Sequence, residues 1–144
     1  MITTQTGATM DFIRCSAQLG LLQWQNGQDE QARALCYRCL RLSVQVADAW
    51  SLLTAIGTTL AILADGENPT RALELYGMLM QSPLCAASRW FADGVGPYVT
   101  KAMDQLDEYA AEAALQRGES LDQRDEASKL VDEVSALGWG SSDR

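Results

Sequence analysis

Three cysteines have the residue types and spacing that could do chemistry. Cys36 and Cys39 form a Cys-x-x-Cys pair, and Cys15 lies in a segment predicted to pack against them. Thiolates bind zinc and exchange electrons, so a metal-responsive or redox site is one interpretation. However, the chain has no histidine and no second Cys-x-x-Cys to complete a tetrahedral set. Since residues three apart on a helix share one face, we favour packing, with cysteine acting as a small apolar side chain.

Adjacent carboxylates are the next candidates, for acid–base chemistry or cation binding. Neighbouring residues on a helix diverge by about 100°, so an adjacent pair cannot converge on one substrate. Without histidine, Ser-His-Asp, Cys-His and HExxH centres are also absent. We therefore predict no catalytic residue, no enzyme and no cofactor, and assign the acidic pairs to helix starts and solvated faces. These pairs are Asp29-Glu30, Asp107-Glu108, Asp125-Glu126 and Asp132-Glu133.

Aromatic and arginine side chains offer a different kind of site, because they anchor many protein interfaces. Arg89 and Trp90 stand at a predicted break between helices, and Trp50 stands at a predicted helix start. We predict these three as partner-binding residues, although burial is the commoner fate of a Trp-Phe pair such as Trp90-Phe91. Trp139, in the predicted C-terminal tail, is expected to be partly exposed.

The elements that must position these residues are predicted to be helices, because apolar residues recur at helical rather than alternating spacing. Local signals mark where these helices begin and end. Asn26-Gly27 and Asp65-Gly66 are predicted to end helices, Asp48 to cap one, and Pro69 to lie in the first turn of another. A last helix is expected after Ser120, with Gln123 in a capping-box position. The predicted helices span residues 10–25, 28–42, 48–63, 69–82, 97–117 with a break near 104–107, and 120–137.

A repeat relates the first two helix pairs, at an offset of 37 to 40 residues. Gly20 and Gly57 stand midway along the first helix of each pair, and Ala32 and Ala72 stand early in the second, where small residues allow helices to approach closely. This is the tetratricopeptide plan in degenerate form. The predicted fold is all-α: antiparallel helix pairs in a right-handed, tetratricopeptide-like solenoid of about six or seven helices. Its parts are a frayed N-terminus (1–9), two helix pairs (10–82), C-terminal and capping helices (83–138) and a tail (139–144).

Length and charge limit the class of protein. The chain has 144 residues, enough for one domain with its own core, and a net charge of -8, the wrong sign for direct nucleic-acid binding. Residues 100–144 hold 11 of the 19 acidic residues, so this end could meet a basic partner, although a solvated capping helix explains it more simply. We expect no signal peptide, no membrane span and a cytoplasmic location, where all four cysteines stay reduced.

Three segments carry a resemblance to a known family: RALELYGMLMQSP (71–83), SRWFAD (88–93) and AALQRGESLDQRDEASKLVDEV (113–134). Over residues 10–137 the chain resembles the C-terminal helical segment of the STAND regulators, large bacterial signal-transduction ATPases that include AfsR-like and large LuxR-type transcription activators. The matching elements are Ala72 to Gly77, Ala114 to Gly118 and Ser120 to Leu137.

That resemblance implies an arm that senses an inducer or partner for an ATPase and a DNA-binding part. The phosphate-binding GxxxxGK[ST] loop is absent here, so the chain looks like an excised or stand-alone arm. We predict a non-enzymatic protein-interaction or sensor domain with a protein or peptide partner, and a homodimer is also expected to be feasible. The alternative is a small-ligand- or metal-responsive bundle using Cys15, Cys36 and Cys39.

Overall fold

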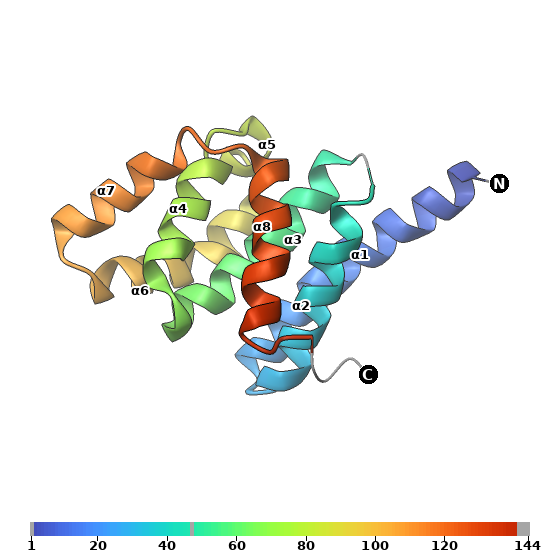
Figure 1. The fold of residues 1–144 in the computed structure, drawn as a ribbon, viewed down its shortest axis with the longest axis horizontal. Coiled ribbons are helices and arrows are strands. Elements are labelled where there is room, and N and C mark those ends of the chain that lie inside the picture. The colour runs from blue at the N-terminus through green and yellow to red at the C-terminus, as the bar shows by residue number, and fades with distance from the viewer. Residues whose placement is uncertain (1, 47, 141–144) are drawn as a thin grey trace.

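The computed structural model describes residues 2–46 and 48–140, with side chains from residue 7 onward. Within these ranges the chain is helical and has no strand, which confirms the predicted all-α class (Figure 1). Two short segments, η1 and η2, interrupt the α-helices. In chain order the elements are α1 (Ile2–Gln25), α2 (Asp29–Ser43), α3 (Ala49–Ile62), η1 (Leu63–Glu67), α4 (Pro69–Leu79), α5 (Pro83–Ala86), η2 (Phe91–Val95), α6 (Gly96–Gln105), α7 (Glu108–Gly118) and α8 (Gln123–Ala136).

Four predicted signals of the first four helices are confirmed: the cap Asp48, Pro69 in a first turn and the two helix-ending turns at Gly27 and Gly66. Asp48 caps α3, because its Oδ2 accepts the backbone N–H three residues later at 2.9 Å. Pro69 occupies the first turn of α4, and Asn68, which was not predicted as a cap, accepts the backbone N–H three residues later at 3.1 Å. Gly27 and Gly66 have φ of 79° and 133°, a left-handed conformation that favours glycine and ends the helical path.

Both ends of the chain differ from the prediction. α1 begins at Ile2 rather than near residue 10, and its first turns project beyond the bundle (Figure 1). Residues 2–9 contain no proline, so a helix nucleated in the packed part extends through them at little cost. The cap of α8 is Asp122, whose Oδ2 accepts from the N–H of Asp125 at 3.0 Å, and not Ser120. Residues 1 and 141–144 of the predicted termini lie outside the described residues.

The core is built around α3. Every residue from Ser51 to Ile62 is buried, including three threonines whose hydroxyls donate to backbone carbonyls. Thr58, for example, donates to the Ala17 carbonyl of α1 at 2.9 Å. The segment Ala49–Glu67 has the length and mean hydropathy, 1.3, of a membrane span, but 78% of its apolar window is buried inside the fold. The central helix of a protein core meets the same criteria, because helices buried in a protein and helices buried in a membrane are both apolar all round.

Two of the predicted small residues meet different neighbours. Gly20 fits the prediction, since a β-carbon there would lie 3.2 Å from the Cys36 sulfur of the paired helix α2. Gly57 does not face its paired helix. A β-carbon on Gly57 would lie 2.7 Å from the Phe91 ring of η2, so this glycine makes room for an aromatic side chain.

α4 and α7 cross with their backbones in contact. A β-carbon on Gly118 would overlap the carbonyl of Glu74, and one on Gly77 would overlap the carbonyl of Leu115. Both crossing points therefore require glycine. These glycines end two of the elements that match the resembling family, Ala72 to Gly77 and Ala114 to Gly118.

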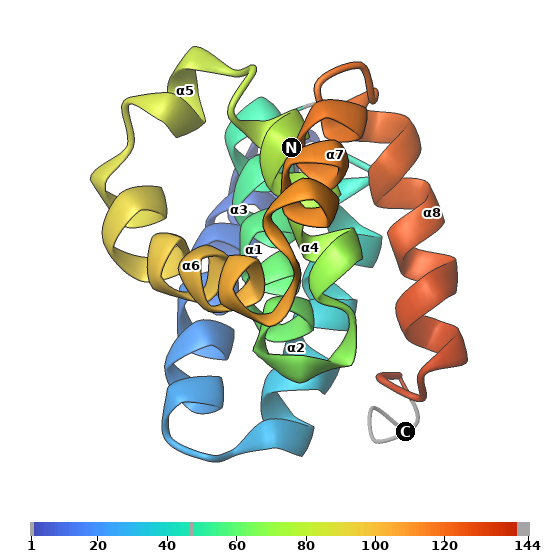
Figure 2. The same ribbon diagram turned by 90° about the vertical axis from the view of Figure 1, so that its left-hand side faces the viewer.

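α8 returns across the molecule to lie against α2, α3 and α4 (Figures 1 and 2). Its side chains Ala127, Leu130 and Val134 are fully buried. In a row of repeats each unit contacts only its neighbours. Contact between α8 and the first helix pair makes the chain a more closed bundle than such a row.

Arg71 of α4 holds α8 in this position. Its Nη2 forms an ion pair with Oε1 of the buried Glu126 at 2.8 Å, and its Nε donates to Glu133 Oε2 at 3.1 Å. Glu74, one turn along α4, contacts Arg71 at 3.4 Å and Arg117 of α7 at 3.0 Å. Burial alone would raise the pKa of Glu126, but the hydrogen bonds and positive charges of its Arg71 and Lys129 partners outweigh burial and lower that pKa.

The close crossing of α4 and α7 predicts the effect of Gly118→Ala on stability. The added methyl group has backbone in its way, so we expect the free energy of unfolding to fall by about 2–3 kcal/mol in urea titration. Gly7→Ala is the control, because its β-carbon meets nothing within 4 Å and alanine favours a helix by about 0.5–1 kcal/mol. Equal responses of the two variants would contradict the close crossing.

The Arg71 network predicts a pH-dependent effect of Glu126→Gln. At pH 7 we expect the variant to lose about 3 kcal/mol, because Arg71 keeps its burial without its buried counter-charge. Since the folded pKa of Glu126 is lowered, its contribution is full above the ordinary glutamate value of about 4.3 and is lost as pH falls through the folded pKa. The two unfolding curves should therefore converge below about pH 4. Asp132→Asn, on the same helix and exposed, should follow wild type.

Candidate functional site

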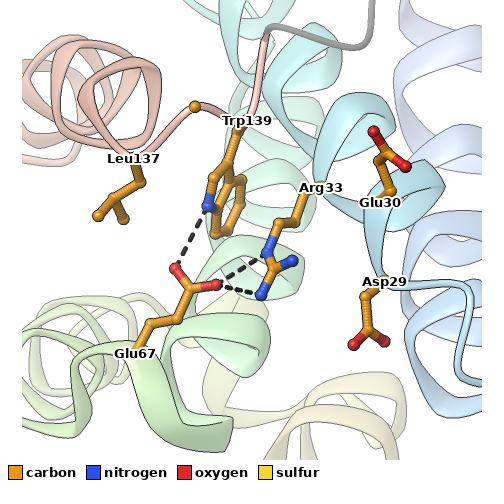
Figure 3. Close-up of a pocket in the computed structure, with 7 residues that line it drawn as sticks. Asp29, Glu30, Arg33, Glu67, Leu137 and Trp139 are labelled. Atoms are coloured by element: carbon orange, nitrogen blue, oxygen red, sulfur yellow. Dashed lines mark hydrogen bonds and ion pairs between the residues drawn. The ribbon is translucent and has the colours of Figure 1, made fainter.

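A cavity of about 630 Å³ lies between the start of α2, η1 and the turn after α8 (Figure 3). Two of its charged side chains, Arg33 and Glu67, form an ion pair with each other. Arg33 Nε and Nη2 lie 2.8 and 2.6 Å from Glu67 Oε1, and Trp139 Nε1 donates to Glu67 Oε2 at 3.3 Å. The cavity is lined by Asp29, Glu30, Arg33, Glu67, Leu137, Gly138 and Trp139.

The sequence predicts that Trp139 is partly exposed, and this prediction is wrong, because the side chain is buried and only 1% exposed. Its indole N–H meets Glu67, which is 72 residues away in sequence, and its ring completes the core. The following residue, Gly140, lies against the Tyr37 ring of α2. The segment after α8 is therefore packed on the bundle through at least Gly140.

Asp29 and Glu30 occupy the first turn of α2, where negative charge is favourable. The other acidic pairs also divide their roles, as the angle between neighbouring helical residues predicts. Asp107 caps α7, while its neighbour Glu108 lines a different surface. Glu126 and Glu133, which belong to two different pairs, both contact Arg71, whose positive charge occupies the space between them and α4.

A groove of about 400 Å³ between α1 and η2 contains two of the three predicted partner-binding residues. Trp90 is half-buried and packs edge-on against the buried Phe91, with ring centroids 4.9 Å apart. Arg89 is exposed beside it. Trp50 does not line the groove. It contacts the same Phe91 at 6.0 Å. The lining residues are Gln18, Leu21, Leu22, Gln25, Arg89, Trp90, Asp93 and Gly94.

Sequence reasoning missed the aliphatic side of this groove. Leu22 lines it and is 55% exposed, whereas its neighbour Leu21 is buried. The available signal was the pair of adjacent leucines, because neighbouring residues on a helix diverge by about 100° and seldom share one buried face. We call the surface formed by Leu22, Arg89 and Trp90 the α1–η2 groove.

The structure does not bring the three thiols together. Cys36 and Cys39 are buried in the core, whereas Cys15 is exposed. The Cys39 thiol points to the Ile13 carbonyl at 3.8 Å, and burial raises its pKa to about 12. Burial also raises the pKa of Cys36, with the nearby Cys39 adding to the effect. The described residues contain no group of three or more side chains placed to hold a metal ion.

Comparison with protein-family models, with curated proteins and with solved structures found no match to the chain. What the chain does must therefore be argued from its own surfaces.

Thiol burial predicts the pattern of cysteine modification. In the native protein, an aromatic disulfide reagent should modify Cys15 quickly, and the buried Cys36, Cys39 and Cys85 about 10³-fold or more slowly, since they react only on unfolding. Cys15→Ser should abolish the fast phase. In denaturant all four wild-type thiols should react. A second fast thiol in the native protein would contradict the packing role.

Proposed function

We propose that the chain is a non-enzymatic helical protein-interaction domain, and that the α1–η2 groove is a contact surface. One observation carries this proposal: the exposed Leu22 lies in one groove with Trp90 and Arg89. Tryptophan and arginine are enriched among residues that dominate binding energy, and an aliphatic residue beside them supplies apolar area. The thiol chemistry of the alternative function lacks comparable support, because two of its three sulfurs are buried.

The arrangement of the first four helices supports a tetratricopeptide-like relationship as part of the proposal. α1 packs on α2, α3 packs on α4, and α3 also packs on both helices of the first pair, as successive repeats do. The return of α8 limits any solenoid to these two pairs and α6–α7. A partner that contacts the domain would act by favouring one state of a larger assembly.

The resemblance to STAND regulators suggests the setting of this interaction: the regulatory arm of a cytoplasmic signalling or transcription-regulating ATPase. Its support is the pair of glycines at the α4–α7 crossing, Gly77 and Gly118, which lie in the resembling segments and cannot carry a side chain. The partner in this proposal is a protein or peptide, or a second copy of the chain.

Affinity capture with matched variants tests the proposal. Wild type, Leu22→Ser and Leu84→Ser are used as bait in an extract of the source cell, with bound proteins identified by mass spectrometry. Leu84 is the matched control, because it is 50% exposed and lies outside the groove. We expect a specific partner on wild type and Leu84→Ser, and a loss of about 2 kcal/mol, or roughly thirtyfold in Kd, for Leu22→Ser.

Two measurements complete this test. The free energies of unfolding of the two variants should agree within about 0.5 kcal/mol, so that lost binding is not lost folding. Sedimentation of wild type and Leu22→Ser would show a dimer that depends on the groove if the partner is a second copy. Identical bound proteins on all three baits, with no self-association, would refute the groove as a contact surface.

A further inference from the structure

The elbow between α6 and α7 forms a second concave surface, which shares no lining residue with the α1–η2 groove. α6 ends at Gln105 and α7 begins at Glu108, and the two helices diverge from this short connection (Figures 1 and 2). Between them lies a cleft of about 480 Å³, which we call the α6–α7 cleft. It is lined by Met103, Asp104, Leu106, Glu108, Ala111, Glu112 and Leu115.

The floor of the cleft is apolar and incompletely covered. Leu106 and Leu115 are half-buried, and Met103 is 42% exposed. On α7 the lining residues 108, 111, 112 and 115 follow the spacing i, i+3, i+4, i+7, so they form one continuous helix face. α4 crosses α7 at Gly118 and at the Leu115 backbone, and Ala111 is buried, so the exposed part of this face is formed by Glu108 and Glu112, beside the half-buried Leu115 side chain.

The rim of the cleft is acidic and has no cation of its own. Asp104, Glu108 and Glu112 take part in none of the ion pairs between described residues. The basic residues nearest in sequence are already engaged: Lys101 pairs with Asp65 of η1, and Arg117 with Glu74 of α4. Three carboxylates therefore surround an apolar floor, a combination that favours a ligand with both apolar and cationic groups.

We propose that the α6–α7 cleft binds a cationic amphipathic helix of a partner protein. Its apolar side chains would cover Met103, Leu106 and Leu115, and its lysines or arginines would face the three rim carboxylates. Amphipathic helices recognise grooves in this way, and an exposed methionine adapts to the shape of such a ligand. A second copy of the chain fits poorly, because each copy has a net charge of -8, and an anionic membrane would be repelled for the same reason.

This inference rests on the proposal that the chain is an interaction domain, and adds a surface and a partner chemistry that the α1–η2 groove does not supply.

The test of the α6–α7 cleft uses a labelled synthetic helical peptide as its probe. The peptide has about 14 residues, is about 21 Å long, and carries leucines at i, i+3, i+4 and i+7 and lysines elsewhere. Fluorescence anisotropy with the full chain should show saturable binding that weakens as salt is added. A peptide of the same composition with scrambled leucine spacing should bind at least about tenfold more weakly.

Variants locate the binding. The triple variant Asp104→Asn, Glu108→Gln, Glu112→Gln should weaken binding by about tenfold or more, since three exposed charge pairs are lost. Met103→Ser, on the apolar floor, should weaken it by about fivefold. The matched control Asp11→Asn, Glu30→Gln, Glu119→Gln removes the same charges from exposed positions outside the cleft and should bind within about twofold of wild type.

Leu22→Ser distinguishes peptide binding in the α6–α7 cleft from binding in the α1–η2 groove. If the peptide binds in the cleft, this variant should bind it as tightly as wild type does. The absence of saturable binding would overturn the α6–α7 cleft as a site for such a helix. So would equal losses in the two triple variants, which would indicate attraction to net charge alone. Loss in Leu22→Ser with retention in the cleft triple variant would assign the peptide to the α1–η2 groove. The capture experiment with Leu22→Ser reports on the groove whichever of these results is found.

Discussion

A network of ion pairs centred on the guanidinium group of Arg71 joins three helices of this domain. This group extends from α4 to two carboxylates of α8, and its neighbour Glu74 extends the network to Arg117 of α7. The Arg71 side chain is 12% exposed and that of Glu126 is 4% exposed, so neither charge is well hydrated. Each therefore depends on the other to offset the cost of burial. The same helix buries Ala127, Leu130 and Val134, so the ion pairs and the apolar contacts of α8 hold it in one position.

Much of the fold follows from local signals in the sequence. Asp48, Asn68 and Pro69 begin helices, and Gly27 and Gly66 end them, because caps and left-handed turns act within a few residues. The position of α8 has no such signal. Arg71 and Glu133 are 62 residues apart, and an ion pair between such distant positions leaves no periodic pattern. The burial of Trp139 against Glu67 and the contact of Gly57 with Phe91 were missed for the same reason.

The candidate surfaces show a similar division. Arg89 and Trp90 were predicted from residue type, and the structure places them together in one groove. Leu22 could not be separated from its buried neighbour Leu21 by periodicity, because α1 has more leucines than one buried face accommodates. The α6–α7 cleft also depends on how far two helices diverge, which is a property of the Leu106–Asp107 connection and not of either helix alone. The two surfaces differ in charge, since arginine and aspartate balance in the groove while the cleft is acidic.

The return of α8 also has a consequence for how the domain is made in the cell. Ribosomes deliver the N-terminal helices first, and a row of independent repeats could fold one unit at a time as each emerged. Here Arg124 of α8 donates to the Val44 carbonyl, which is 80 residues earlier and was synthesised long before it. Until α8 leaves the exit tunnel, α2 and α4 present an uncovered apolar surface, and Arg71 has no partner in α8. Throughout that interval this surface is accessible to chaperones, and the bundle cannot be completed before α8 emerges.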